Sequence, residues 1–198
     1  PAVTPVILDL LAERGIEATF FILSERAEAH PELARRVAAE GHEVALHGAN
    51  HDNLTTLGMR QVFDRVTGGR RRLSRVVGAP VRLFRPPYGA QSLRTFALTR
   101  LSGMKVVVWS ADPNDWDEID SEEIVERTLR QVEPGGIILL HDGWTPNPGR
   151  HGAGPSGDKP YIVKLILDGL DGAGLRCTTV SGLLASNPAR RRVWFETG

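Results

Sequence analysis

The chain has 198 residues, of which 41% are hydrophobic, and this is enough for one domain with a sizeable core. Lysine plus arginine and aspartate plus glutamate both number 24, so the formal net charge at pH 7 is zero. This balance argues against a nucleic-acid-binding protein, which would carry a basic excess. No apolar run is long enough for a membrane span, and one cysteine, Cys177, cannot form an internal disulfide.

Helices and strands are predicted to alternate along the chain. In chain order, the pattern predicts helix 5–15, strand 16–23, helix 30–41, strand 42–48, helix 57–77, strand 81–89, helix 92–103, strand 104–112, helix 121–132, strand 135–143, helix 159–174 and strand 175–184. The strands are almost continuously apolar, which is typical of a parallel sheet covered by helices. The sequence therefore predicts an α/β fold whose sheet is either open or closed into a barrel.

Two interruptions of this pattern are informative. Gly68 and Gly69 are expected to bend the helix over 57–77. The stretch 145–158 is rich in glycine and proline and too long for a simple connection, so it is expected to be a surface flap.

Polar residues cluster where the predicted strands end. They are His47 and His51 after strand 42–46, Arg85 after 81–84, Asp112 and Asp115 after 104–109, and His141 after 137–140. In parallel α/β sheets and barrels, functional sites are built at the carboxyl ends of the strands. Their recurrence at four strand ends predicts a catalytic site.

Taken singly, these residues have alternative interpretations. His47 and His51 could be two ligands of a zinc-type ion, which would need a third ligand, or an ordinary surface or capping pair. Arg85 could pair with a structural carboxylate, and Asp112 and Asp115 could simply form a turn. His141 at the end of an apolar strand is best suited to donate a proton.

With these residues the chain resembles the polysaccharide deacetylase family, the family-4 carbohydrate esterases. The resemblance runs from about residue 1 to residue 184 and includes four of the five family motifs, in family order. They are His47-Gly48-Ala49-Asn50-His51, Arg85-Pro86-Pro87-Tyr88, Asp112-Pro113-Asn114-Asp115-Trp116 and Leu139-Leu140-His141. Flanking segments such as ATFFI (18–22) are also typical of the family.

The resemblance implies a fold, a reaction and residue roles. The fold would be a distorted (β/α) barrel with fewer than eight parallel strands. The reaction would be metal-dependent removal of acetyl groups from an N-acetylated sugar polymer or oligomer of the chitin or peptidoglycan type. The roles would be metal ligands for His47 and His51, orientation of the catalytic base for Arg85, tuning of the general acid His141 for Asp112, oxyanion binding by the Tyr88 backbone N–H, and substrate contacts for Pro87, Tyr88, Trp116 and Leu139.

The chain departs from the family pattern in two places. Gly48 stands where the family usually has Ser or Thr, and a modest effect is expected. The family's first motif, Thr-Phe-Asp-Asp, which supplies the base and the third metal ligand, is not in the 198 residues. The expectation is a chain that begins just after this motif and lacks the first strand, with the third ligand, an Asp, upstream of Pro1. These residues alone are then expected to bind the metal, most simply Zn²⁺, weakly and to catalyse poorly.

Other readings of the function remain open. The chain could be a non-catalytic carbohydrate-binding relative, a deacetylase of acetylxylan, or a hydrolase of small amides. The expected domain is 1–184, with a tail at 185–198. The resemblance alone suggests a cell-envelope, periplasmic or secreted location, while the oligomeric state is left open.

Overall fold

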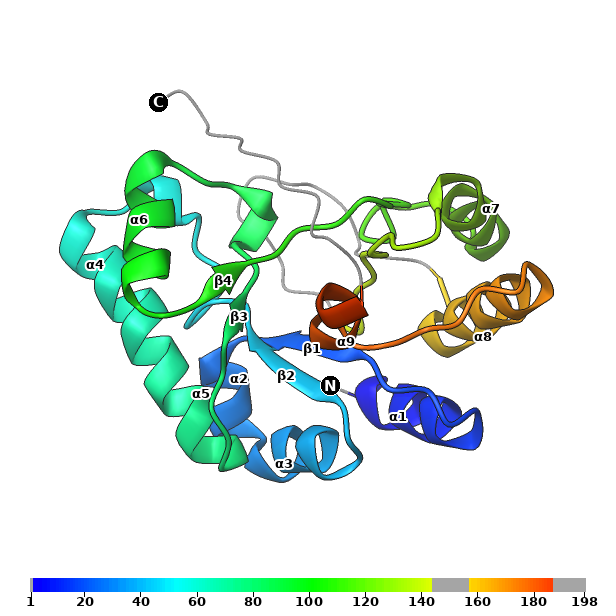
Figure 1. Ribbon diagram of the computed structural model, residues 1–198, viewed down its shortest axis with the longest axis horizontal. Coiled ribbons are helices and arrows are strands. Elements are labelled where there is room, and N and C mark those ends of the chain that lie inside the picture. The colour runs from blue at the N-terminus through cyan, green and yellow to red at the C-terminus, as the bar shows by residue number, and fades with distance from the viewer. Residues whose placement is uncertain (1, 144–156, 187–198) are drawn as a thin grey trace. The chain divides into compact units, whose positions relative to one another are not determined.

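Four short parallel strands form the sheet of this α/β fold. The computed structural model describes residues 2–143 and 157–186. Strands β1 (Thr19–Ile22), β2 (Glu43–Leu46), β3 (Leu83–Phe84) and β4 (Lys105–Val106) lie side by side in that order (Figure 1). All three neighbouring pairs are parallel, as the apolar strand pattern predicts. The predicted α/β class is therefore confirmed, with fewer than eight strands in the described sheet.

The chain divides into two units by its internal contacts. Unit 1 comprises residues 1–17 and 109–178, and unit 2 comprises residues 18–108 and 179–198. The sheet β1–β4 belongs to unit 2. Each unit is described by itself below.

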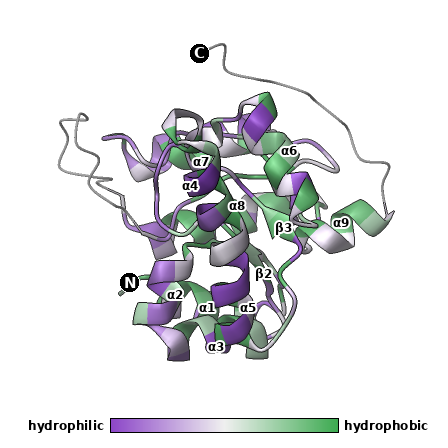
Figure 2. Cartoon of the chain, turned by 90° about the vertical axis from the view of Figure 1, so that its left-hand side faces the viewer, coloured by the Kyte–Doolittle hydropathy of each residue, from purple (hydrophilic) through white to green (hydrophobic). Residues whose placement is uncertain are grey.

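Unit 2 packs helices against the sheet. These are α2 (Ser24–Ala29), α3 (Pro31–Ala39), α4 (Met59–Phe63), α5 (Gly69–Val77), α6 (Leu93–Leu101) and α9 (Val180–Ser186), with 3₁₀ turns η1 (Leu54–Thr56) and η3 (Pro87–Gly89). The core includes Leu46, Val62, Leu73, Phe84 and Met104, each at most 1% exposed. Figure 2 shows β3 in the green of hydrophobic residues. Burial of such apolar side chains supplies the main stabilisation of the unit.

The predicted bend at Gly68-Gly69 is a change of helix type. The predicted helix 57–77 is divided into α4, a π-helical turn η2 (Asp64–Gly68), and α5. A Cβ atom at Gly69 would lie 3.4 Å from the Leu46 side chain and from the Ala49 backbone N. The glycine therefore lets α5 approach the segment that follows β2, which carries the predicted histidines.

Two elements of unit 2 differ from the prediction. Helix α2 follows β1 directly and is not predicted by the sequence pattern. The predicted strand 175–184 is wrong, because its second half forms helix α9. The Thr179 hydroxyl accepts a hydrogen bond from Gly182 N (3.1 Å), which is the bond of a helix N-cap. Val180 N donates to Thr19 Oγ1 (2.8 Å), so the helix is fixed beside β1 by contacts that the sequence does not reveal.

Unit 1 is built mainly from helices α1 (Thr4–Glu13), α7 (Ser121–Gln131) and α8 (Lys159–Gly172). Helix α8 packs against both α1 and α7. Within the described residues, the predicted strand 135–143 pairs only through a parallel bridge between Ala111 and Ile138. Leu139 N also donates to Ala111 O (2.9 Å), so the extended segment before His141 is held against the end of the predicted strand 104–112.

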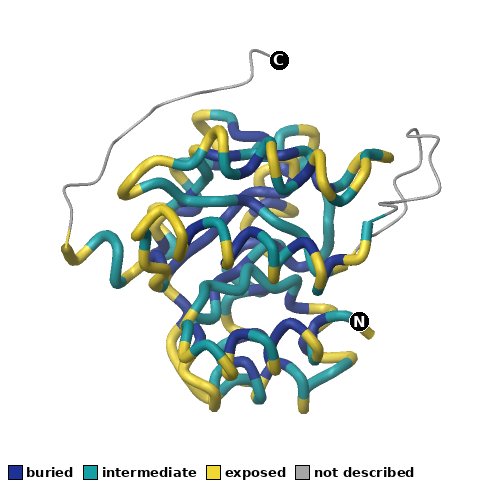
Figure 3. The backbone as a smooth tube through the Cα atoms, turned by 90° about the vertical axis from the view of Figure 1, so that its right-hand side faces the viewer, coloured by how far each residue is buried: buried dark blue, intermediate teal, exposed yellow. Residues whose placement is uncertain are grey.

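Buried and exposed residues alternate along the chain in both units. In Figure 3, buried dark-blue stretches alternate with exposed yellow turns along the tube. No helix among the described residues is long and apolar enough to cross a membrane. Residues 145–156 of the predicted flap and residues 187–198 of the predicted tail lie outside the described residues.

Candidate active site

His47 is fixed at the carboxyl end of β2 in unit 2. Its backbone N donates to Ile22 O (2.9 Å), and Arg85 N donates to Leu46 O (2.9 Å), so both residues continue the ladder of the sheet. The His47 Nδ1 atom lies 2.8 Å from the Arg85 carbonyl oxygen. Because a carbonyl oxygen only accepts, Nδ1 carries the proton and Nε2 carries the lone pair. This is the arrangement by which proteins usually orient a metal-binding histidine.

His51 lies next to His47. Their ring centroids are 5.1 Å apart, and the His51 ring contacts the Tyr88 ring at 4.5 Å, edge to face. Tyr88 has a left-handed backbone (φ 60°, ψ 6°), which non-glycine residues adopt rarely and at some cost. Such strain is concentrated at functional sites. Unit 2 therefore brings together the predicted residues His47, His51 and Tyr88.

Arg85 is a buried charge beside this histidine pair. It is 6% exposed, and its guanidinium carbon lies 3.9 Å from the centre of the Phe21 ring. Burial lowers the pKa of Arg85 to about 10, so the side chain is still protonated at neutral pH. A guanidinium over an aromatic face is stabilised by the ring quadrupole. A buried cation of this kind at a strand end is suited to hold an anionic group.

Gly48 has a backbone conformation that the family's usual residue would not adopt easily. Its φ is +107°, and a Cβ atom there would lie 2.9 Å from the Asn50 carbonyl oxygen. Its own carbonyl accepts a hydrogen bond from Ser24 N (3.0 Å) at the start of α2. The loop is thus tied to the neighbouring helix in a shape that requires glycine.

Replacing Gly48 by the family's serine should therefore be unfavourable. We expect Gly48→Ser to lower the free energy of unfolding by about 1–3 kcal/mol, because a side chain is forced into a left-handed, crowded position. Chemical denaturation of the two proteins would measure the difference. Gly78→Ser, also at positive φ (+70°) but with nothing within 4 Å of its Cβ position, is the matched control and should cost less. Equal losses in both variants would show that crowding by Asn50 is unimportant.

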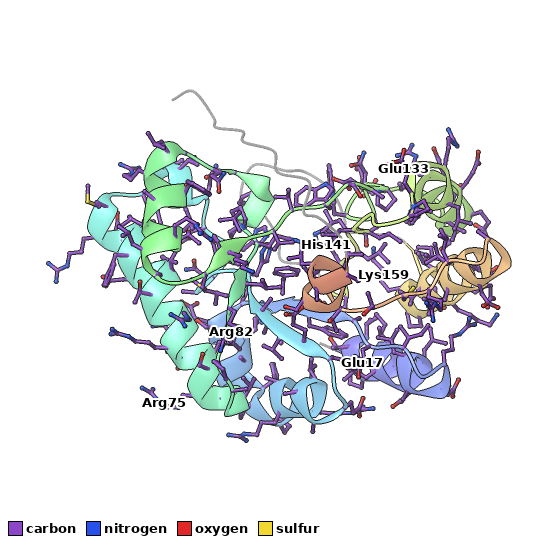
Figure 4. The ribbon with its side chains drawn as sticks, in the orientation of Figure 1. Glu17, Arg75, Arg82, Glu133, His141 and Lys159 are labelled. Carbon is purple, nitrogen blue, oxygen red and sulfur yellow. The ribbon has the colours of Figure 1, made fainter. Side chains whose placement is uncertain are left out.

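In unit 1, His141 is held by a buried carboxylate. Its ring Nδ1 lies 2.6 Å from Asp115 Oδ1, and its backbone N donates to Asp115 Oδ2 (2.8 Å). Asp115 is fully buried, whereas the His141 side chain is 31% exposed. The same carboxylate accepts a hydrogen bond from Lys159 Nζ of α8 (2.8 Å). His141 and Lys159 are labelled in Figure 4. The Nδ1 side of the His141 imidazole is thus held by Asp115, while the rest of the ring is partly accessible to solvent.

The electrostatics of Asp115 reflect these contacts. Burial by itself would raise the pKa of Asp115, but the hydrogen bonds and charges of His141 and Lys159 outweigh it and hold the pKa below its ordinary value. Asp115 is therefore an ionised, buried acceptor. It fixes the Nδ1–H tautomer of His141, in which Nε2 is the atom available for proton transfer.

The partner of His141 is Asp115 and not Asp112, to which the family resemblance assigns that role. The Asp112 carboxylate accepts from Asn114 N (3.0 Å), and Asn114 takes a left-handed backbone (φ 59°). This is a turn in which an aspartate bonds to the backbone two residues on. Asp112 therefore shapes the loop that carries Asp115. Of the two aspartates, Asp115 is the one whose carboxylate contacts His141.

The four predicted substrate-contacting residues are divided between the units. Pro87 is buried and Tyr88 is 48% exposed in unit 2. In unit 1, Leu139 is 6% exposed and Trp116 is partly exposed. The exposed part of Tyr88 and Trp116 leaves their rings accessible to a sugar, whereas Pro87 and Leu139 are buried.

Lys159 is a polar residue beside Asp115 that belongs to none of the sequence motifs. It occupies the first position of α8, between the N-cap Asp158 and Pro160. A signal was present in the sequence, because a cation at a helix N-terminus opposes the helix dipole and is seldom placed there. Its partner Asp115 lies 44 residues away in the chain, so the pairing itself could not be read.

Comparison with known proteins places this chain in one family. Residues 1–107 match the family described as polysaccharide deacetylase. A chitooligosaccharide deacetylase of Sinorhizobium fredii is 41% identical over 148 residues, which cover 74% of this chain and 69% of that protein. A peptidoglycan-N-acetylglucosamine deacetylase of Bacillus cereus is 34% identical over 186 residues, covering 93% of this chain and 83% of that protein.

Solved structures agree with this placement. Peptidoglycan deacetylase PdaC from Bacillus subtilis superposes with a TM-score of 0.79 at 30% identity, covering 93% of this chain and 84% of that chain. A mutant of a CE4 family pseudoenzyme from Bacillus anthracis gives a TM-score of 0.81 at 23% identity and shares the fold; this chain covers 62% of its length. Sequence motifs, family match and fold lead to one conclusion: the chain belongs to the polysaccharide deacetylase family.

Proposed function

We propose that this protein removes acetyl groups from an N-acetylated sugar polymer or oligomer of the chitin or peptidoglycan type. The proposal is supported most directly by the pairing of His141 with the fully buried Asp115 carboxylate in a chain of this family. Its relatives include proteins named chitooligosaccharide deacetylase and peptidoglycan-N-acetylglucosamine deacetylase. Deacetylation requires protonation of a departing amine, which a histidine oriented by a carboxylate can perform.

A divalent metal, most simply Zn²⁺, fits the histidine pair of unit 2. The Nδ1–H of His47 is taken by the Arg85 carbonyl, so Nε2 has the lone pair that a metal ion binds, and the His51 ring is adjacent. Among the described residues no group of three His, Cys, Asp or Glu side chains could hold a metal. We therefore propose that a carboxylate from outside these residues completes the site. A bound ion would polarise the acetyl carbonyl and lower the pKa of a water molecule.

The residues of this chain then have the following proposed roles. His47 and His51 bind the ion, and buried Arg85 orients the carboxylate that takes a proton from water. The backbone N–H of Tyr88 stabilises the oxyanion that forms on the acetyl group. His141 gives its Nε2 proton to the departing amine, while Asp115 keeps the ring in place and stabilises the charged imidazole before transfer. Trp116 and Leu139 contact the acetyl group and the sugar.

Deacetylation in the presence and absence of a chelator tests this proposal. The protein is incubated with N-acetylated chitooligosaccharides or with peptidoglycan, and released acetate is measured. We expect little acetate release from these 198 residues alone. From a chain that also carries the Thr-Phe-Asp-Asp motif, we expect acetate release that a chelator abolishes and that added Zn²⁺ restores, because the water and the acetyl carbonyl are activated by the metal. His141→Gln, which removes the proton donor, should lower the rate by about 100-fold or more under the same conditions.

Other outcomes would separate the competing functions. Release of acetate from acetylxylan but not from N-acetylated sugars would make the protein an ester deacetylase. Binding of chitooligosaccharides with no acetate release, even with saturating Zn²⁺ and with the Thr-Phe-Asp-Asp motif supplied, would contradict the proposal and favour a carbohydrate-binding role.

A further inference from the structure

Two features of its position are unfavourable for the positive charge of Lys159. The residue is 8% exposed, so its ammonium is largely removed from water, which is unfavourable for a charge without a counter-charge. It is also the first residue of α8, where the positive end of the helix dipole repels a cation. A lysine in this place needs a compensating interaction.

Asp115 provides that interaction through two acceptors. Lys159 Nζ donates to Asp115 Oδ2 (2.8 Å) and also to the backbone oxygen of the same residue. The Asp115 carboxylate thus receives three hydrogen bonds: His141 Nδ1 on Oδ1, and His141 N and Lys159 Nζ on Oδ2. Both carboxylate oxygens have fixed partners, which prevents the carboxylate from rotating.

We propose that Lys159 is a positioning residue that locks Asp115, side chain and backbone, in the orientation that aligns His141. The inference rests on the proposed function for its consequence, since an aligned His141 matters for protonating the leaving amine. Lys159 itself does not touch the reacting atoms. It acts through Asp115, because its ammonium group on Oδ2 keeps the carboxylate ionised and leaves Oδ1 for the His141 ring.

This arrangement predicts the direction in which the pKa of Asp115 changes when the charge of Lys159 is removed. The charged groups that act on Asp115 are His141, which follows the Ile138 bridge, and Lys159, from α8. Both favour the ionised carboxylate, while burial opposes it. Removing the Lys159 charge must therefore raise the pKa of Asp115. Protonated Asp115 has no negative charge with which to stabilise the charged His141 imidazole, so activity should then be lost at a higher pH.

The test is Lys159→Met, which keeps the apolar stem of the side chain and removes the ammonium group. The Asp115 carboxyl is followed by ¹³C NMR titration, and kcat is measured against pH with tetra-N-acetylchitotetraose. We expect the Asp115 titration and the acid limb of the kcat profile to move together to higher pH by about 1. We also expect kcat at neutral pH to fall by about 10- to 100-fold, the usual loss when a group that orients a functional histidine is removed.

Lys164→Met is the matched control. Lys164 lies on the same helix, is 54% exposed in its side chain, and pairs with Asp168 (2.9 Å). This variant changes charge by the same amount but should leave the Asp115 titration and the kcat profile in place. An unchanged Asp115 titration in Lys159→Met, or an equal change in both variants, would overturn the proposal.

A measurement on the unaltered protein covers the case in which Lys159→Met does not fold. In ¹⁵N-lysine spectra, the Lys159 ammonium protons should exchange slowly, and the Nζ signal should move as Asp115 titrates. Exchange as fast as that of Lys164, with no response to Asp115, would overturn the proposal. These NMR readouts do not depend on catalysis, so an inactive protein with the expected coupling would refute the proposed function and leave the role of Lys159 standing.

Discussion

Asp115→Asn is expected to lower kcat by about 1,000- to 10,000-fold, the scale seen when the carboxylate that orients a catalytic histidine is made neutral. An amide at this position presents an N–H₂ group to one of the donors His141 Nδ1–H and Lys159 Nζ, which both bond to the carboxylate in the structure. The imidazole would then take the wrong tautomer or rotate away. Steady-state kinetics with a chitooligosaccharide would measure the loss, which should be in kcat more than in KM.

The comparison with Asp112→Asn decides between the two aspartates of the motif. Family resemblance assigns the tuning of His141 to Asp112, whereas the structure places the Asp115 carboxylate on the ring. An asparagine at 112 can still accept the hydrogen bond from Asn114 N through its amide oxygen. We therefore expect Asp112→Asn to keep kcat within about threefold of the unaltered protein, as for a turn residue with a retained acceptor. A larger loss for Asp112→Asn than for Asp115→Asn would refute the structural assignment.

Asp115→Asn should also reduce the stability of the protein. Asn at 115 leaves the buried Lys159 ammonium without its counter-charge, and breaking a buried pair in this way costs about 3–5 kcal/mol. The pKa of Asp115 is lowered in the folded protein, so its stabilising contribution is full above the pKa of the unfolded chain. It is lost as the pH falls through the folded pKa. The stability difference between the two proteins, measured by denaturant unfolding, should therefore shrink at acid pH.

His47→Ala is expected to weaken Zn²⁺ binding by more than about 100-fold, since even the loss of a group that only orients a metal ligand commonly costs 10- to 100-fold. His47 is proposed as a direct ligand, with its Nδ1–H fixed on the Arg85 carbonyl. Isothermal titration with Zn²⁺ would measure the affinity, and acetate release should fall in parallel. Excess Zn²⁺ should restore little activity, because a ligand and not merely its orientation has been removed.

His30→Ala is the control for nonspecific zinc binding by imidazole. His30 is a partly exposed histidine between α2 and α3, and its nearest charged neighbour, Glu32, is 4.0 Å away. We expect this variant to bind Zn²⁺ as the unaltered protein does. Equal affinities for His47→Ala and His30→Ala would contradict the metal-ligand role of His47.

Much of the fold was predictable because local patterns agree with the tertiary structure. Helix 5–15 becomes α1, helix 30–41 becomes α3, and the apolar strands pair in parallel. The last strand was wrong for a physical reason: residues 175–184 are rich in strand-forming types, but the Thr179 cap and the contact of Val180 with Thr19 stabilise a helix. A contact between residues 161 positions apart overrides local preference there.

Sequence alone identified the candidate site residues and their places after apolar segments. His47 and Arg85 follow neighbouring apolar strands of one sheet, and parallel strands bring such positions to one edge of a sheet. The backbone hydrogen bonds of His47 and Arg85 continue those of β2 and β3, and the His47 ring bonds to the Arg85 carbonyl oxygen. These positions are set by local periodicity, which a sequence displays.

Only the tertiary structure decided which groups are partners. Asp112 and Asp115 are equivalent candidates in the sequence, and they differ because the left-handed turn at Asn114 directs one carboxylate to the backbone while the other reaches His141. Lys159 carries no motif, yet it holds Asp115 from a helix far along the chain. Hydrogen bonds and ion pairs depend on direction and on separations of about 3 Å, which folding sets and sequence spacing does not encode.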